Sequence, residues 1–361
     1  MKKQGKIILI IIFLSALIWG CTKNDGTLES LTLKQTINES AFTLNNAMDA
    51  ISLTKAYSIL TITDGTLTDG TLKKSSSLVD SVYSVYIPLD KIKGIYDYKP
   101  VTELNVWGQP LIHFFTKVDD NSQMIVRMPL SKVTNPGTLR KYSPSDTSLT
   151  NNFSIAVSNY YNNYNSYWDY DYLLASEISV DSVVAGSLNI KSFVNPRQGI
   201  HYASEFAFNE SYTAKYQYDS GDTTISSFTI MGDDKVLYEE KLITEMNSTS
   251  MFGRERQYIL TIGDVQIIRK TGTKVVEVYV NGIFQPNAVV VIVDKEADPE
   301  ASVCKKRDIQ ITFEDGTTTT VSALIGTSIG NIKTLFDSLH KVYFAAYVVD
   351  WIAYDIYYQR N

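Results

Sequence analysis

The spacing of apolar residues changes twice along the chain. From about residue 82 to about residue 324, apolar and polar residues alternate in short runs that are separated by turn-forming residues, which is typical of β-strands. Asn281-Gly282 is the strongest hairpin signal, because both residues tolerate positive φ angles. Short connections between successive strands predict antiparallel pairing, and no stretch alternates strands with crossover helices.

Helical periodicity flanks this strand region on both sides. Residues 39–61 carry apolar positions at intervals near three and four, with Asn38 or Ser40 as the expected N-cap. Near the C-terminus, intervals of three and four alternate over a longer apolar seam: Ile332, Leu335, Leu339, Val342, Ala346, Val349, Ala353 and Ile356. We expect one deeply buried helix over about 331–357, with a terminal strand over 347–358 as the alternative.

These elements predict an α+β fold. The expected architecture is a large curved antiparallel β-meander with the N-terminal helix and the long C-terminal helix packed on one face, because a long antiparallel sheet needs one face covered. Residues 37–361 would form this β-rich globular domain, with a sub-boundary near 131–175. Residues 21–36 are polar and read as a tether that precedes it.

The first 21 residues have the pattern of a secretion signal. Three lysines precede an apolar segment over 7–19, and Gly20 and Cys21 follow. Thirteen helical residues span only about 20 Å, which is short of a hydrocarbon core of about 30 Å. The string Ile18-Trp19-Gly20-Cys21 resembles the lipobox of bacterial lipoproteins. The resemblance implies that residues 1–20 are a cleaved signal peptide and that the Cys21 thiol carries a diacylglyceryl group.

The composition carries a second resemblance. The chain has 24 Tyr against 14 Phe, and this bias, with abundant Asn and Ile, resembles uncharacterised envelope lipoproteins of the Bacteroidetes group. The segment over 87–98 resembles the same proteins. Two or more acyl chains would hold the protein stably on a membrane. Thr22 after the cysteine gives no Asp-type inner-membrane retention signal, so we expect the outer membrane and leave the leaflet open.

The acidic charge limits the classes of partner. The formal net charge is −6, and it becomes −9 when Lys2, Lys3 and Lys6 leave with the signal peptide. No basic block is present to neutralise phosphates, so a nucleic-acid partner is not expected. Basic residues would not hold the protein on a membrane either, and the lipid on Cys21 would do so.

The residues that usually bind metals are sparse and poorly spaced. If Cys21 is acylated, Cys304 is left alone, and we expect it to be a small buried apolar residue without a disulfide or a zinc site. No two histidines have a metal-binding spacing, and His113 is expected within an apolar strand; the three histidines are His113, His201 and His340.

The acidic string over 294–300 could hold Ca²⁺ through its alternating carboxylates. It lacks the Gly at loop position six and the Glu at position twelve, where Pro299 and Lys305 stand. We interpret it as a solvated hairpin loop, and no metal or cofactor is expected.

One string matches a hydrolase motif. Residues 326–330 read G-x-S-x-G between a predicted strand over 317–324 and the C-terminal helix, which would make Ser328 a nucleophile. Asp337 and His340 would lie about 14 and 18 Å farther along the same helix, too far from Ser328 to activate it. We therefore interpret the string as a loop in which Thr327 or Ser328 caps the helix, and we expect no catalysis.

An aromatic stretch over 160–172 is the strongest candidate for a binding surface. Six tyrosines and one tryptophan alternate there with Asn and Asp: Tyr160, Tyr161, Tyr164, Tyr167, Trp168, Tyr170 and Tyr172. Such rings could stack on a glycan or a peptide, since aromatic residues often anchor binding surfaces. The alternative is a strand or loop whose rings pack along the sheet.

The sequence leaves three hypotheses for function. The first is a lipid-anchored envelope lipoprotein with a structural or binding role, for which the sequence leaves an envelope protein, a glycan or an apolar ligand open as the partner. The second is a carrier or sensor of an apolar ligand held between the curved sheet and the terminal helix, which requires a cavity of several hundred cubic ångströms lined by Val, Phe and Tyr. The third is a carbohydrate- or peptide-binding surface at 160–172.

Overall fold

The computed structural model describes most of the chain after its first 31 residues. The described residues are 32–61, 84–100, 102, 109–141, 144–246, 254–273, 275–294 and 307–360. Residues Leu33–Asn361 form one compact unit, and the strands that cross the region 131–175 belong to the same sheet as their neighbours. The signal peptide, Cys21, Cys304 and most of the acidic string over 294–300 lie outside the described residues.

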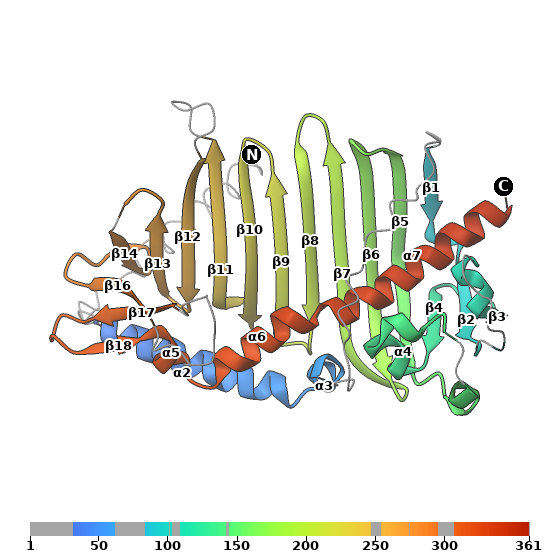
Figure 1. Cartoon of the computed structure of the whole chain (residues 1–361), viewed down its shortest axis with the longest axis horizontal. Helices are drawn as coiled ribbons and strands as arrows, with labels where there is room; N and C mark the ends of the chain where they lie inside the picture. The colour runs from blue at the N-terminus through green and yellow to red at the C-terminus, as the bar shows by residue number, and fades with distance from the viewer. Residues whose placement is uncertain are drawn as a thin grey trace, which may run out of the picture. The chain divides into compact units, whose positions relative to one another are not determined.

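A mixed α+β architecture is built on one large sheet of 15 strands (Figure 1). Its strands are β1 (Val85–Pro88), β2 (Gly94–Tyr98), β3 (Phe115–Asp119), β4 (Met124–Met128), β5 (Phe153–Ser166), β6 (Asp169–Val180), β7 (Val183–Asn195), β8 (Gly199–Ala207), β9 (Tyr212–Ser220), β10 (Thr223–Gly232), β11 (Lys235–Met246), β12 (Arg254–Ile262), β13 (Val265–Lys270), β14 (Val276–Val280) and β15 (Ile283–Phe284). From β4 to β15, each strand pairs antiparallel with the next along the chain, as the meander requires.

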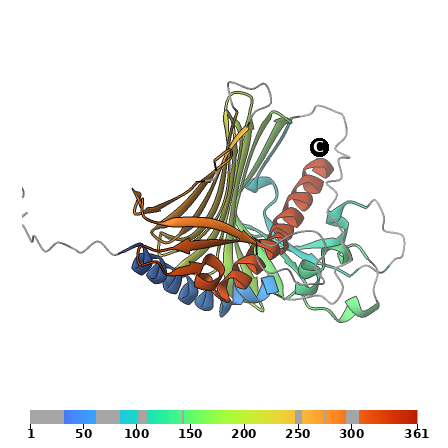
Figure 2. The same ribbon diagram turned by 60° about the vertical axis from the view of Figure 1, so that its left-hand side comes forward.

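Three features depart from a single meander. Strand β1 lies off the linear strand order and pairs antiparallel with β5. Strands β2 and β4 pair in parallel, with β3 at the outer edge of the sheet. The last three strands form a second sheet: β16 (Val289–Asp294), β17 (Arg307–Thr312) and β18 (Thr318–Thr320). Figure 2 shows that the large sheet is bent and twisted, and its linear strand order from β15 to β3 shows that it is not closed.

Helices cover one face of the large sheet. Helix α2 (Leu33–Ser52) packs against β11, β12 and β13, and α3 (Lys55–Thr61) packs against β7. The C-terminal helices α6 (Ser328–Ser338) and α7 (His340–Arg360) follow, and α7 crosses β8 to β5 diagonally (Figure 1). All eight residues of the predicted apolar seam are buried, which confirms the C-terminal helix over the alternative strand.

Each of the two predicted helices is divided. The N-terminal helix begins at Leu33, so Asn38 and Ser40 lie inside it and do not cap it, and residues 33–36 belong to this helix and not to the expected tether. It is interrupted after Ser52, where the Thr54 hydroxyl accepts a hydrogen bond from the Tyr57 amide at 3.1 Å and thereby caps α3. At the other end of the chain, Leu339 separates α6 from α7.

The turn between β6 and β7 lies four residues before the place that the sequence suggests. The sequence pattern predicts strands over 176–184 and 187–194, which leaves residues 185 and 186 as their connection. In the structure, Asp181 and Ser182 form the turn, with φ angles of 52° and 63°. Gly186 lies inside β7, where an added Cβ would be 2.4 Å from the Ala207 carbonyl oxygen. Its role is to permit close approach of β8 and not to reverse the chain.

Two further strand predictions are wrong. Residues Leu111–Phe114 form a 3₁₀ turn, so His113 is exposed and is not part of an apolar strand. The predicted strand over 317–324 ends at Thr320, and Val321–Ile325 form the short helix α5, whose first turn is capped by the Thr320 side chain.

Gly186 and Gly330 provide a stability test with opposite expected signs. Gly186→Ala should lower the free energy of unfolding by about 1–3 kcal/mol, because the new methyl group overlaps the neighbouring strand. Gly330→Ala lies in α6 with no atom within 4 Å of the new Cβ, and it should raise stability by up to about 1 kcal/mol. Urea unfolding measures both, and a Gly186→Ala protein as stable as the wild type would contradict the close approach.

Candidate functional site

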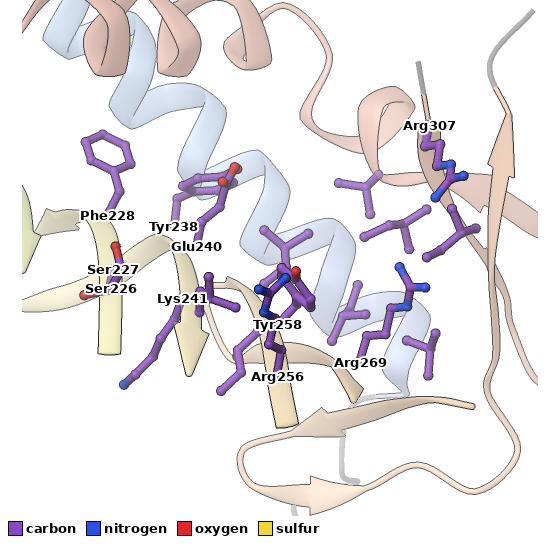
Figure 3. A pocket seen from close by; sticks show the side chains of 18 of the residues that line it. Ser226, Ser227, Phe228, Tyr238, Glu240, Lys241, Arg256, Tyr258, Arg269 and Arg307 are labelled. Carbon is purple, nitrogen blue, oxygen red and sulfur yellow. The ribbon is translucent and has the colours of Figure 1, made fainter. Parts of the chain in front are cut away.

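A groove of about 890 Å³ opens on the helix-covered face of the large sheet. Its floor comes from strands β9 to β14, and its other walls come from β16 and β17 of the small sheet and from helices α5 and α6 (Figure 3). Its volume falls in the range of several hundred cubic ångströms that the apolar-ligand hypothesis requires. The wall opposite the large sheet is formed by α6 and the small sheet, not by α7.

Strand register determines which side chains form the floor. Successive residues of a strand point to opposite faces, so residues paired across neighbouring strands share a face. One row across β10 to β14 consists of Ser226, Leu242, Tyr258, Arg269 and Val276. The next row, closer to α2, consists of Phe228, Glu240, Leu260, Ile267 and Val278. The floor is therefore mainly apolar, with a few polar and charged positions at fixed places.

The opposite wall is also apolar. Val290 and Ile292 of β16 and Ile309 of β17 face the groove, together with Val321 of α5. At the end nearest β10, the rings of Phe228 and Phe336 meet edge to face, with centroids 5.4 Å apart. This ring contact joins α6 to the sheet beside the groove.

The charged groups of the groove differ in their partners. Glu240 accepts a hydrogen bond from the Tyr238 hydroxyl, and burial together with this carboxylate raises the pKa of Tyr238. Asp308 accepts hydrogen bonds from the amide and hydroxyl of Ser322 at the start of α5. Arg307 lies 3.8 Å from Asp294, measured from Nε to Oδ1.

Two arginines of the floor are exposed and have no such partner. In the part of the chain that the structure describes, no carboxylate forms an ion pair with Arg256 or Arg269. Figure 3 shows Arg269 and Arg307 pointing toward one another from the two walls, whereas the Lys241 side chain points away from the groove.

The aromatic stretch over 160–172 forms the β5–β6 hairpin and divides into three groups. Tyr160 and Tyr172 are 2% and 4% exposed and face α7. Tyr164, Tyr170 and Tyr161 are half-buried, and the first two have their ring centroids 6.3 Å apart in an edge-to-face contact. Tyr167 and Trp168 are exposed at the hairpin tip, at 71% and 69%. The seven rings therefore do not share one exposed plane.

Asp350 explains the burial of the two innermost tyrosines. This carboxylate lies on α7 in contact with the sheet, and it accepts hydrogen bonds from the hydroxyls of Tyr172 at 3.0 Å and Tyr160 at 3.1 Å. Burial raises the pKa of Asp350 to about 7, and the two tyrosine hydrogen bonds oppose the rise. Asp350 was not among the predicted site residues, although it is the single acid inside the apolar run of residues 342–353.

The remaining candidates are separated in space. Ser328 is the first residue of α6, is 1% exposed and follows helix α5, so the strand required before a nucleophile elbow is absent at this position. Thr327 precedes it without a side-chain capping bond. His201 pairs with Asp219 on the sheet face opposite the helices and stacks on Phe193. No group of three potential metal ligands occurs among the described residues.

Comparison with known proteins gives no relative: no protein-family model, no curated protein and no solved structure matches the chain. Among the helices of the described residues, a membrane-spanning candidate is not found.

The raised pKa of Asp350 predicts a pH-dependent stability. The folded protein keeps this proton up to about pH 7, whereas the unfolded chain releases it near the ordinary carboxyl pKa of 3.8. Stability should therefore fall as the pH rises from about 4 to about 7, by about 4 kcal/mol if the whole shift is expressed. Asp350→Asn should remove this part of the pH dependence, as measured by urea unfolding at several pH values. Parallel pH profiles for the two proteins would contradict it.

Proposed function

We propose that this chain is a non-catalytic binding protein of the bacterial cell envelope that holds an apolar ligand in the groove between the large sheet and the small sheet. The observation that carries the proposal is the groove of about 890 Å³ with walls of Val, Ile, Leu, Phe and Tyr. Small-molecule sites are commonly about 300–1,000 Å³ in volume and mostly apolar with a few placed polar groups.

Burial elsewhere on the same face supports this choice of site. Under α2, Ile262 and Val265 at the closed end of the β12–β13 hairpin are each 1% exposed. Farther along β12 on the same face, Leu260 is only half-buried and Tyr258 is 45% exposed. The apolar face of the sheet thus extends beyond the helices that cover it, and a ligand in the groove would bury the remainder.

The β5–β6 hairpin is a weaker candidate for a binding surface. Tyr160 and Tyr172 are engaged by Asp350, so their hydroxyls and ring faces are not available to a glycan. The exposed rings at its tip are Tyr167 and Trp168, and Tyr167 already contacts Tyr164 with centroids 6.1 Å apart.

The anchor is the second part of the proposal, and it rests on the sequence of residues 1–21. Acyl chains on Cys21 would keep the protein at a membrane, where apolar ligands are concentrated. A lipid-anchored binding protein would then need neither a cofactor nor a nucleic-acid partner.

A matched pair of substitutions on β11 tests the groove. Leu242 lines the groove, and its neighbour Ile243 points to the opposite face of the sheet and is also half-buried. Leu242→Trp should fill the groove and weaken the binding of the uncharged dye Nile red at least tenfold, whereas Ile243→Trp should leave it unchanged. Fluorescence titration of the chain without residues 1–20 gives both affinities.

Circular dichroism and thermal unfolding show whether each variant is folded. A wild-type protein that binds no Nile red, or equal losses in two folded variants, would be incompatible with an apolar site in this groove.

The anchor has its own test. In a bacterial host that processes lipoproteins, the mature protein should begin at Cys21 and carry added acyl mass, and it should fractionate with membranes. Cys21→Ala should abolish the added mass and the membrane association, whereas Cys304→Ala should leave both unchanged. Intact mass spectrometry of the two fractions measures this, and an unacylated wild-type protein would contradict the proposal.

A further inference from the structure

We propose that the ligand of the groove is an amphiphile with an anionic head, and that Arg256 and Arg269 bind this head while the tail lies on the apolar floor. This inference rests on the proposed apolar site and adds the chemical class of the ligand. It is carried by the placement of the two guanidinium groups relative to the apolar side chains.

The polarity of the floor changes along the strands. On β12, Ile262, Leu260, Tyr258 and Arg256 point to the same face in that order, from beneath α2 to the far end of the strand. On β13, Val265, Ile267 and Arg269 repeat the order from buried apolar to exposed cationic. Ile262 and Val265 are covered by α2, so the apolar floor that is open to the groove begins with Leu260 and Ile267. With about 3.3 Å per residue, this row lies roughly 7 Å along the strands from the row of Tyr258 and Arg269.

The two arginines form one site. Arg269 pairs directly with Tyr258, and Arg256 is two residues before Tyr258 on the same face. Arg256 and Arg269 are therefore diagonal neighbours, whose Cα atoms are expected about 7–8 Å apart. Two forked guanidinium groups at this spacing can both donate to one carboxylate or phosphate.

Among the described residues, the acidic groups of the groove do not pair with Arg256 or Arg269. Glu240 is engaged by Tyr238, and it pairs with Leu260, four residues from Arg256 along the neighbouring strand. Asp308 is engaged by Ser322. Arg307, on the opposite wall, adds a third guanidinium group that points toward Arg269 in Figure 3, although Asp294 partly neutralises it. On a chain with a net charge of −6, this concentration of positive charge favours an anion.

Amphiphiles with one tail and different heads test the inference. Dodecanoate and dodecyl phosphate carry an anionic head, and dodecanol carries an uncharged one. In Nile red displacement with the wild-type chain lacking residues 1–20, we expect both anions to bind at least tenfold more tightly than dodecanol, and more weakly as salt increases. Inorganic phosphate alone should not displace the dye, since it has no tail.

Charge-removing variants identify the residues. The double variant Arg256→Gln/Arg269→Gln should lose about tenfold in affinity for each anion and keep the wild-type affinity for dodecanol and Nile red. Lys241→Gln removes one positive charge from the same sheet, but its side chain points away from the groove, so it should change neither affinity.

The results separate this inference from the proposed function. If Nile red and dodecanol bind but the anions bind no more tightly than dodecanol, the ligand does not need an anionic head and only the apolar site stands. The same holds if the double variant prefers the anions over dodecanol as strongly as the wild type does. If neither Nile red nor any amphiphile binds, both proposals fall. Displacement by inorganic phosphate alone would show an anion site without an amphiphile and would also overturn the inference.

Discussion

The structure depends on covering one apolar face of a sheet that is longer than any of its helices. Fifteen strands present their inward side chains to the same side, and such a face is stable in water only where other groups bury it. Helix α7 buries the part formed by β5 to β8, and α2 buries the turn end of β11 to β13. The groove lies on the part of the face that neither helix covers. There the small sheet and α6 form the opposite wall without closing on the sheet. Its position therefore follows from how the helices cover the sheet.

Two kinds of charged residue on this face have opposite surroundings. Asp350 is buried, receives two tyrosine hydroxyl hydrogen bonds, and has a pKa raised to about 7 by burial, so its environment is complete within the protein. Arg256 and Arg269 are exposed beside apolar side chains, and the described residues supply no acidic partner. A satisfied buried polar group fixes how elements pack, whereas cationic groups beside an uncovered apolar surface are available to a ligand. This contrast is why we place the site in the groove and not at the tyrosine hairpin.

The amino-acid pattern predicts which helices and strands form better than it predicts where they end or which residues make up the groove site. The seam from Ile332 to Ile356 is long and strictly periodic, so the apolar spacing alone is enough to identify the C-terminal helix. The turn at Asp181 is missed because Gly186 is the stronger local turn signal, and only the neighbouring strand shows that this glycine serves close approach. The arginine pair could not be predicted from the sequence, for a related reason. Arg256 and Arg269 are 13 residues apart, and the register of one hairpin decides whether they share a face.

The side chains that line the groove depend on the register of these strands. A shift of β12 by one residue would turn its groove-facing side chains to the opposite face and bring Gln257, Ile259 and Thr261 into the groove. The register is held at the β12–β13 turn, where Gly263 has a φ of 54° and an added Cβ would lie 2.6 Å from the Ser40 hydroxyl on α2. The Asp264 amide donates to that hydroxyl at 3.4 Å. The contact between the β12–β13 turn and Ser40 of α2 thus also helps to set which side chains face the groove. The packing of the N-terminal helix and the chemistry of the site therefore depend on the same turn.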